Sequence, residues 1–280
     1  MTALLEVADL RKTFRSGRGM LAKGAATLAV DDVSFDVSRG STFGLVGESG
    51  SGKSTTARIV ARLLDADSGS VRLDGKELLG LRGGDLFAMR RRVQMVFQDP
   101  FASLDPRWTV GALVTEGMRI HKIRPRREQT DRAVELLEQC GLPADAVRKY
   151  PHEFSGGQRQ RIGIARALAV EPEVLVLDEP VSALDVSIQA QVLNLLAELQ
   201  EQLGLTYLFI AHDLAIVERF CDDVAVMCNG RIVERGTPEV LYSTPTHEYT
   251  RTLLSAVPVP DPRRRRQRIN HRRVDDEVTA

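Results

Sequence analysis

The chain has 280 residues, a length that suits one large domain or a core with an inserted lobe. Its 38 basic residues are balanced by 38 acidic ones, so charge gives no reason to expect nucleic acid as the main partner. No segment approaches the roughly 20 uninterrupted apolar residues that cross a bilayer, and residues 1–13 are too charged for a signal peptide. Cys140, Cys221 and Cys228 lack paired or metal-like spacing, so we expect a cytosolic protein with reduced, mostly buried thiols.

The first part of the chain has the pattern of β-strands. Residues 4–10 and 30–37 alternate between apolar and polar side chains, and a Gly- and Lys-rich connection at residues 16–27 joins them. This pattern predicts an antiparallel pair. Residues 42–46 are apolar enough for a buried parallel strand, and residues 54–64 carry apolar side chains at helical spacing.

That strand and that helix flank a loop with phosphate-binding chemistry. Glycines in the loop let the backbone aim its N–H groups at phosphate oxygens, Lys53 adds a positive charge, and Ser54 offers a hydroxyl to Mg²⁺. A match to this motif should arise by chance in only about one in a hundred chains of this size, so a fortuitous turn is a weak alternative. The predicted nucleotide-binding residues are Gly47, Glu48, Ser49, Gly50, Ser51, Gly52, Lys53, Ser54 and Thr55.

The middle of the chain changes from strands to helices and back. Residues 69–73 and 93–97 read as strands, whereas the apolar residues of 108–169 follow a helical period that prolines interrupt. This change predicts a helical lobe inserted into an α/β core. Strands then alternate with a helix, which favours a mostly parallel sheet. The later elements are expected at residues 174–177, 188–203 and 206–210, followed by a hairpin at Asn229-Gly230 and, beyond Pro258, a poorly ordered tail.

Two adjacent carboxylates stand at the end of the strand at residues 174–177. Asp178 is placed to reach Mg²⁺ directly or through water, and Glu179 to polarise an attacking water. Neighbouring residues at a strand end point in different directions, which suits two separate roles. An exposed acidic turn is the alternative, and the apolar run before the pair and the phosphate loop upstream both disfavour it.

Further motifs resemble those of a known family. The run Phe154-Ser155-Gly156-Gly157-Gln158 resembles the signature of ATP-binding-cassette (ABC) ATPases. Gln98, residues 182–185 and His212 stand in the order of that family, and the resemblance covers roughly residues 4–257. It implies a P-loop NTPase cassette of the α/β class, with a mostly parallel sheet core, an antiparallel β subdomain and an inserted α-helical lobe. Residues 1–257 would form the ATPase domain, with the lobe at about 108–169, and residues 258–280 a flexible tail.

The resemblance also implies the cofactors ATP and Mg²⁺ and the roles of several residues. Ser54, Gln98 and Asp178 would hold the metal. Glu179, His212 and Gln98 would form the catalytic group, with His212 on the γ-phosphate. A lone histidine after a strand is more often a packed or surface residue, but its place behind the other motifs favours the functional interpretation.

The signature implies a second cassette. In such ATPases two cassettes associate head to tail, and the signature of one contacts the ATP bound to the other. A helix N-terminus with a hydroxyl suits that contact, because it attracts anions. The alternative is a Gly-rich loop that merely caps the helix from Gly156 to Ala169, which explains the glycines but not Gln158. The residues implied in the contact are Ser155, Gly156, Gly157, Gln158 and Asp185.

A narrower resemblance points to the ATPase subunits of oligopeptide and dipeptide importers. Residues 98–107 and the closing stretch at 249–260 carry it. It implies a peripheral protein on the cytoplasmic side of the membrane, with transmembrane permease subunits as partners and an external solute-binding protein as an indirect one. The second cassette is either another copy or a related chain, and the resemblance favours a related chain. No nucleic acid is expected.

Some features depart from the family pattern. Residues 23–29 contain no aromatic side chain to stack on adenine, and Phe14 or a residue of the 16–27 connection is the candidate substitute, with a core position as the alternative for Phe14. No cysteine follows Cys228, so no iron–sulfur cluster is expected. The arginines at 263–266 offer a local basic run, but the acidic residues after them favour a simply solvated tail.

Two rival functions remain at this stage. A soluble ABC ATPase of DNA repair or translation is disfavoured because the chain lacks long heptad runs, zinc-type cysteine pairs and a second cassette. A small-molecule kinase or GTPase would leave the signature and residues 182–185 unexplained, and no guanine-type Asn-Lys-x-Asp motif occurs.

Overall fold

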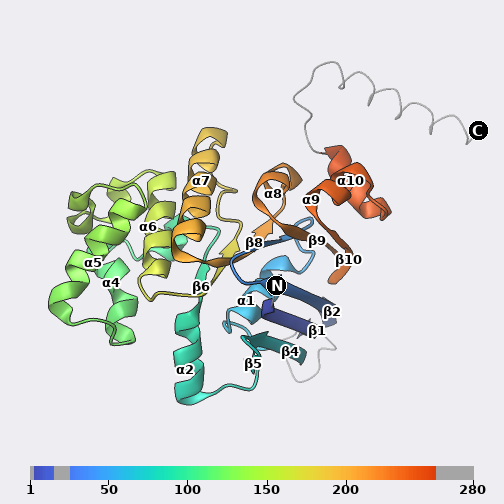
Figure 1. Cartoon of the computed structure of the whole chain (residues 1–280), viewed down its shortest axis with the longest axis horizontal. Helices are drawn as coiled ribbons and strands as arrows, with labels where there is room; N and C mark the ends of the chain where they lie inside the picture. The colour runs from blue at the N-terminus through green and yellow to red at the C-terminus, as the bar shows by residue number, and fades with distance from the viewer. Residues whose placement is uncertain (1–2, 16–25, 257–280) are drawn as a thin grey trace, which may run out of the picture.

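The computed structural model describes residues 3–15 and 26–256. The predicted tail at 258–280 and most of the predicted connection at 16–27 therefore lie outside the described residues. Two sheets form the core, and a group of helices lies at one end of the larger sheet (Figure 1). The four-stranded sheet has the order β2-β1-β4-β5, and the six-stranded sheet has the order β10-β9-β3-β8-β7-β6.

The smaller sheet is antiparallel, as the alternating pattern near the start of the chain predicts. β1 pairs with β2 on one side and with β4 on the other, and a turn at Asp74-Gly75 joins β4 to β5. Its strands are β1 (Ala3–Arg15), β2 (Ala26–Ser38), β4 (Ser68–Leu73) and β5 (Lys76–Glu77).

The larger sheet is parallel except at one edge, where β10 runs antiparallel to β9. Every residue of β3, β7 and β8 is buried, which explains why these strands are unbroken apolar runs rather than alternating ones. Because most of the strands are parallel, their carboxyl ends lie at the same end of the sheet. The functional motifs lie at that end. The strands are β3 (Thr42–Val46), β6 (Val93–Val96), β7 (Val174–Asp178), β8 (Thr206–Ala211), β9 (Asp223–Cys228) and β10 (Arg231–Gly236).

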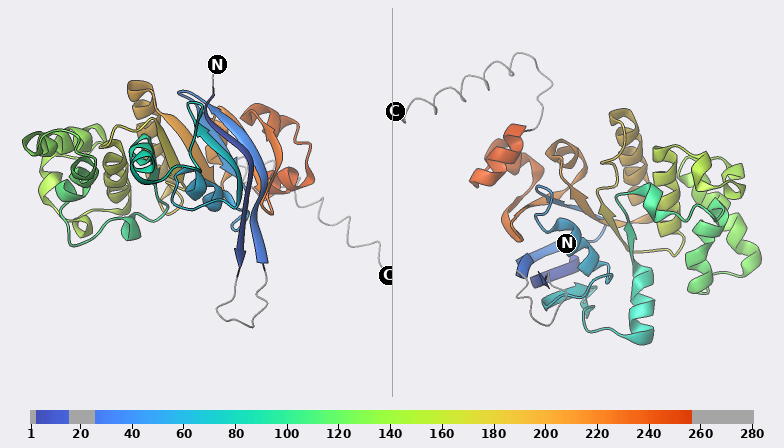
Figure 2. Two further views of the ribbon diagram at one scale, coloured as in Figure 1. Left: turned by 90° about the horizontal axis from the view of Figure 1, so that it is seen from below. Right: turned by 180° about the vertical axis from the view of Figure 1, so that it is seen from behind.

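Helices cover both faces of the larger sheet (Figure 2). The helix predicted at 54–64 is shorter than expected, because Arg62 adopts a left-handed backbone (φ 56°) just after its end. Four short helices were not predicted: α2, α8, α9 and α10. The helices of the core are α1 (Lys53–Val60), α2 (Gly83–Arg92), α7 (Val186–Leu203), α8 (Leu214–Phe220), α9 (Pro238–Ser243) and α10 (Glu248–Ala256).

A run of helices separates β6 from β7. It begins before the predicted start at Trp108, because Asp99 caps a short helix with hydrogen bonds from Phe101 N and Ala102 N. The punctuating prolines act as expected, since Pro125 precedes α5 and Pro151 opens η2. The elements are α3 (Pro100–Ser103), α4 (Val110–Ile120), α5 (Arg126–Gln139), η1 (Ala144–Arg148), η2 (Pro151–Glu153) and α6 (Gly156–Leu168).

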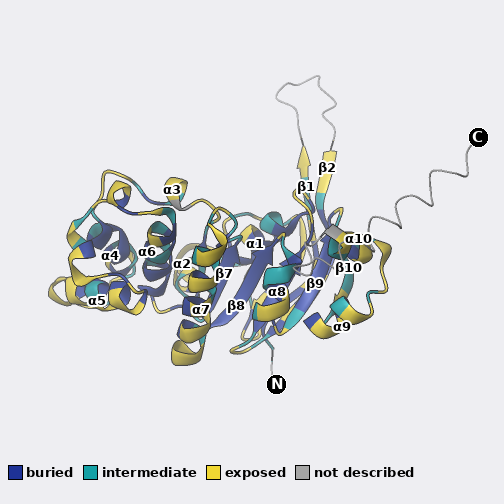
Figure 3. Ribbon diagram, turned by 90° about the horizontal axis from the view of Figure 1, so that it is seen from above, coloured by how far each residue is buried: buried dark blue, intermediate teal, exposed yellow. Residues whose placement is uncertain are grey.

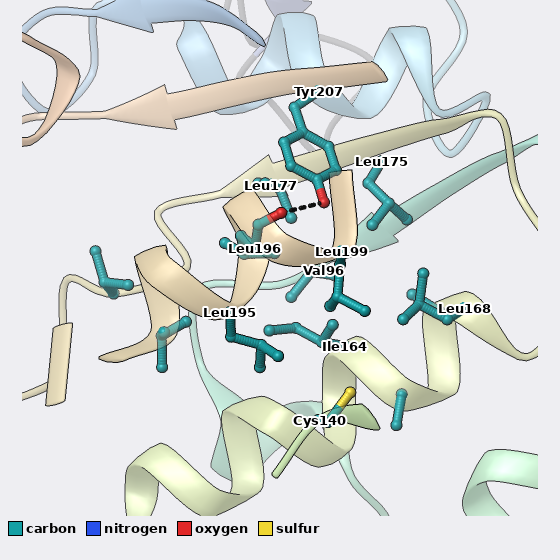
Figure 4. Packing of buried hydrophobic residues seen from close by; sticks show 14 of the residues in the cluster. Val96, Cys140, Ile164, Leu168, Leu175, Leu177, Leu195, Leu196, Leu199 and Tyr207 are labelled. Carbon is teal, nitrogen blue, oxygen red and sulfur yellow. Dashed lines mark hydrogen bonds between the residues drawn. The ribbon is translucent and has the colours of Figure 1, made fainter. Parts of the chain in front are cut away.

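The strands of the larger sheet are mostly buried (Figure 3). Their side chains belong to two hydrophobic groups, one on each face of the sheet. Leu175 and Leu177 of β7 face the group shared with α6 and α7, whereas Val174 and Val176 face the group shared with α1. In the first group, the Tyr207 hydroxyl donates a 2.8 Å hydrogen bond to the Leu196 carbonyl, so a buried polar atom is satisfied (Figure 4).

The cysteines behave largely as expected. Cys140 is fully buried in the first group, and burial raises the pKa of its thiol to about 12 (Figure 4). Burial likewise raises the pKa of Cys221. Cys228 is only partly buried. The two buried thiols are therefore inert fillers rather than nucleophiles.

Candidate functional site

The phosphate loop joins β3 to α1 and packs against two other strands. Gly47 and Gly52 have left-handed backbones, with φ of 153° and 107°. A Cβ atom at Gly47 would lie 2.1 Å from the Met227 carbonyl oxygen, and one at Gly52 would lie 2.2 Å from the Ala29 carbonyl oxygen. Both positions therefore require glycine for backbone conformation and for close approach. The Ser51 carbonyl also accepts a hydrogen bond from Gly230 N, which ties the loop to the predicted hairpin.

Lys53 is buried at the centre of this loop, with 3 % of its surface exposed. Its ammonium donates to the carbonyls of Gly47 (2.7 Å) and Glu48 (2.8 Å) and to Ser51 Oγ (3.3 Å). These bonds use all three of its donors. Burial lowers the pKa of Lys53, and nearby carboxylates, Glu179 foremost, oppose that shift. The loop thus contains a positive charge beside the uncapped N-terminus of α1, and both features suit an anion.

Asp178 and Ser54 meet beside the loop. Ser54 Oγ donates a 2.8 Å hydrogen bond to Asp178 Oδ1, and Asp178 is 2 % exposed. Burial raises the pKa of this carboxyl, while the Ser54 bond and the charge of Arg58 oppose the shift. A serine hydroxyl and a carboxylate are oxygen ligands of the kind that Mg²⁺ prefers.

Glu179 faces a different direction, as expected for adjacent residues at a strand end. Its carboxylate accepts a 2.8 Å hydrogen bond from Gln98 Nε2 and lies 3.4 Å from His212 Nδ1. Glu179 also has a left-handed backbone (φ 48°), a conformation that is costly for a residue with a side chain and is often found at functional sites. Gln98 follows β6 and His212 follows β8, so three separate strand ends bring this group together.

Most of these residues line one cleft of about 590 Å³, whereas the predicted site residues Gly47, Ser51 and Asp178 lie behind its wall. No Phe, Tyr or Trp of the described residues lines it. The lining residues include two that sequence reasoning did not assign, Ala29 and Leu253. No local sequence pattern marks Ala29 or Leu253, because only the packing of distant segments brings these residues to the cleft. The lining residues are Ala29, Glu48, Ser49, Gly50, Gly52, Lys53, Ser54, Thr55, Gln98, Glu179, His212 and Leu253.

The signature residues lie elsewhere. In the described part of the chain, neither Ser155 to Gln158 nor Asp185 lines the cleft. Ser155 is the N-cap of α6, and exposed Asp185 precedes α7 as its N-cap. The structure therefore brings the phosphate loop, Asp178, Glu179, Gln98 and His212 together and leaves the signature apart from them.

Gln158 has a local role that the sequence interpretation missed. Ser155 Oγ accepts a hydrogen bond from Gln158 N (3.4 Å), and Gln158 Oε1 accepts one from Ser155 N (3.0 Å). This reciprocal pair is a capping box. Gly157 is needed for helix packing, since a Cβ atom there would lie 2.4 Å from Ile188 Cγ2 of α7. The expectation that a capping role leaves Gln158 unexplained was therefore wrong.

Comparison with known proteins decides the family. A family model for ABC transporters matches residues 30–182, and a model for the C-terminal region of oligopeptide/dipeptide transporters matches residues 233–278. The chain belongs to the ABC transporter family. An oligopeptide transport ATP-binding protein, OppF, of Bacillus subtilis is 52 % identical over 271 residues, which cover 96 % of this chain and 87 % of that protein. OppF of Streptococcus mutans is 51 % identical over 268 residues, which cover 95 % and 85 %.

Solved structures agree with this membership. A dimeric ATP-binding cassette in a post-hydrolysis state with ADP and Pi has a TM-score of 0.74 and 28 % identity, and the match covers 84 % of this ABC chain and 98 % of that one. The P-loop NTPase cassette and its ATP hydrolase activity, expected from the motifs, are confirmed. The family leaves no support for a small-molecule kinase or GTPase, and it does not favour a DNA repair or translation ATPase.

Proposed function

We propose that this chain is the ATP-hydrolysing subunit of an importer for peptides or similar small solutes, which it drives through separate permease subunits. The match of residues 233–278 to the oligopeptide/dipeptide C-terminal region carries the proposal, and the names of the OppF relatives support it. No helix in the described ranges is long and apolar enough to cross a membrane. Other subunits would supply the transport path, and the chain would bind them at the cytoplasmic face.

The cleft would hold ATP with Mg²⁺. The phosphates would lie against the N–H groups of the loop and the Lys53 ammonium, where the N-terminus of α1 adds a favourable field. Ser54 and Asp178 already converge at 2.8 Å, and Gln98 lies at the same end of the sheet, so these three would supply the protein ligands of Mg²⁺. The described residues hold no separate cluster of three or more His, Cys, Asp or Glu side chains suited to a metal.

Glu179 would act as the general base. Its carboxylate is within hydrogen-bond reach of Gln98 and near His212, so a water above the γ-phosphate would be held by the same group of side chains. Gln98 lies just before α3, the first helix of the lobe. Movement of Gln98 when ATP binds would therefore be transmitted to the helical lobe. His212, more than half exposed, would contact the γ-phosphate.

Phe14 is the best candidate for adenine stacking. It is 44 % exposed near the end of β1, so its alternative role as a core residue is wrong. It pairs with Thr27 of β2, the strand that contributes Ala29 to the cleft. An exposed ring at this edge is available to a planar base.

Two cassettes would complete each ATP site together. Because Ser155 to Gln158 and Asp185 do not line the cleft of their own chain, they are free to contact ATP bound to a partner cassette. The dimeric arrangement of the related cassette with ADP and Pi supports this pairing. The partner would be a second copy or a related chain, and the external solute-binding protein would act only through the permease.

Lys53→Ala should weaken ATP binding at least tenfold. The substitution removes a charged contact worth roughly 1.5 to 3 kcal/mol and also the three hydrogen bonds that hold the loop. Calorimetry on the full chain measures the affinity. Lys149→Ala is the matched control, because Lys149 is a surface residue paired with Asp145 and should leave ATP binding unchanged. Unchanged affinity in Lys53→Ala would mean that the loop is not the phosphate site.

A groove between the core and the helical lobe would bind the permease. It has a volume of about 290 Å³ and lies between α1, α2 and β6 on one side and α4 and α6 on the other. Leu63 and Ile120, which are 51 % and 53 % exposed, line it. Arg90 and Arg166 add positive charge, which Glu116 offsets in part. Such exposed apolar residues in a groove favour a protein partner. A cytoplasmic segment of the permease with apolar side chains and an acidic group would fit.

Ile120→Glu should remove the permease from the complex and spare ATP binding. A carboxylate at this position would be desolvated on docking, which costs several kcal/mol if unpaired. The full chain, tagged and purified from membranes, is expected to retain permease subunits that mass spectrometry identifies. Ile120→Glu should reduce their yield at least tenfold, whereas the control Leu203→Glu, on the exposed end of α7, should not. Recovery of repair or translation proteins in place of permeases would refute the importer function.

A further inference from the structure

Helix α10 lies beside the phosphate loop, although the two are far apart in the chain. The Tyr249 hydroxyl accepts a 3.0 Å hydrogen bond from the backbone N–H of Glu48, a residue 201 positions away. Leu253, one helical turn after Tyr249, lines the nucleotide cleft. One face of α10 therefore contacts both the loop and the cleft. Figure 1 shows α10 next to β10, at the edge of the larger sheet opposite the helical lobe.

Both backbone polar groups of Glu48, the N–H and the carbonyl, form hydrogen bonds with side chains. Lys53 Nζ donates to the Glu48 carbonyl, and the Glu48 N–H donates to Tyr249. A phosphate bound in the loop would compete for the donors of the Lys53 ammonium. The hydrogen bond from Lys53 to the Glu48 carbonyl would then weaken. Tyr249 does not line the cleft and has no such competitor. Its bond to Glu48 persists and keeps the first turn of the loop in place.

The start of α10 is itself firmly anchored. Glu234 of β10 accepts hydrogen bonds from Thr246 N (2.6 Å), Thr246 Oγ1 (2.9 Å) and His247 N (3.1 Å). Burial by itself would raise the pKa of Glu234, but hydrogen bonding to the carboxylate outweighs it and lowers the pKa to about 2. The carboxylate is thus ionised at neutral pH and accepts strongly.

A second brace holds the same turn. The Arg251 guanidinium donates to the carbonyls of Pro245 (3.0 Å) and Thr246 (2.9 Å). Burial raises the pKa of the Tyr249 phenol, which keeps it neutral and able to accept from an N–H group. Tyr249 therefore presents its hydroxyl from a fixed platform, which is the requirement for orienting another group.

We propose that Tyr249 is a positioning residue for the phosphate loop, holding the Glu48 N–H so that the loop is ordered before ATP arrives. This inference rests on the proposed binding of ATP at Gly47 to Thr55. Preorganisation lowers the entropy lost on binding, so its removal acts on affinity and not on the chemical step. Tyr249 does not touch the reacting atoms.

Tyr249→Phe is expected to weaken ATP binding by about fivefold, the usual worth of one neutral hydrogen bond. KM for ATP should rise by a similar factor in the assembled transporter, and kcat should stay within about twofold. The matched control is Tyr242→Phe, because the Tyr242 hydroxyl donates to the Leu214 carbonyl, away from the cleft. That variant removes a hydroxyl of the same kind and should leave ATP affinity unchanged.

Amide hydrogen exchange provides a second measurement that does not depend on ATP. Exchange at Glu48 N–H should be about fivefold faster in Tyr249→Phe than in the wild type, because the bond that protects this amide is gone. Tyr242→Phe should leave exchange at Glu48 unaltered.

The outcomes separate this inference from the function on which it rests. If the wild type binds ATP and Lys53→Ala does not, but Tyr249→Phe binds ATP normally, the positioning role is wrong while the phosphate site stands. Equal losses of affinity in Tyr249→Phe and Tyr242→Phe would indicate a general loss of stability and would also overturn it, as would a fall in kcat at constant KM. Failure of the wild type to bind ATP would instead refute the proposed site.

Discussion

Glu179→Gln should lower ATP hydrolysis by about 10² to 10⁴ and leave ATP bound. Glutamine keeps the size and polarity of the side chain, and its amide oxygen can still accept from Gln98, which lies 2.8 Å from the Glu179 carboxylate. It cannot take a proton from water. The affinity for ATP should change little, because Lys53 and the loop N–H groups remain in place.

Single-turnover hydrolysis and ATP binding, measured on the same preparation, test this expectation. Glu171→Gln is the matched control, because Glu171 is an exposed carboxylate that pairs with Arg91 and Arg124 away from the cleft. Its loss should have little effect on either quantity. Trapped ATP should also hold two Glu179→Gln cassettes together, which sedimentation would detect. A normal rate of hydrolysis in Glu179→Gln would show that another group activates the water.

The second large effect concerns the site shared between two cassettes. Ser155→Arg should leave ATP binding to the isolated chain nearly intact and block closure of the pair, because a bulky cation would replace a small hydroxyl at the proposed interface. Ser155 caps α6, so the substitution also costs about 1 kcal/mol of stability. Thr109→Arg controls for that cost, since Thr109 caps α4 through the same kind of bond to Ala112 N and lies outside the cleft.

Mixing two variants gives the decisive comparison. If a Ser155→Arg chain pairs with a Lys53→Ala chain, one composite site carries both lesions and the other carries neither, so the intact site should trap nucleotide. If both substitutions lie on one chain and the partner is unmutated, each site carries one lesion, and trapping should fall at both. A related second cassette would receive the equivalent substitutions. Identical trapping in the two arrangements would contradict the head-to-tail site.

The sequence by itself determined the features that depend on neighbouring residues. The phosphate loop was predictable because its glycines, Lys53 and Ser54 act within one strand–loop–helix unit, where spacing alone sets the geometry. The same holds for β7, whose buried apolar run and terminal carboxylates form one continuous pattern. Family membership followed from these motifs and their order, and the comparisons confirmed it.

Several helix positions and helix ends were not predicted from the sequence. Helices α2, α8 and α9 are short and pack against strands, and helices of this length depend on such packing more than on their own sequence pattern. Helix α10 is amphipathic, so its pattern was present in the sequence and was missed. The end of α1 depends on the left-handed backbone at Arg62, which no residue preference predicts. The reciprocal cap between Ser155 and Gln158 was visible as a pattern, but its meaning required the hydrogen bonds.

Only the tertiary structure decided which distant side chains share one site. Gln98, Glu179 and His212 meet because parallel strands β6, β7 and β8 end at one edge of the sheet, and strand order is set by packing over the whole core. The separation of Ser155 from the cleft and the contact of Tyr249 with Glu48 have the same origin. A motif reflects the chemistry of residues that are adjacent in the chain. The contact between Tyr249 and Glu48 spans 201 positions, and it forms only when the two hydrophobic groups pack on the faces of the sheet.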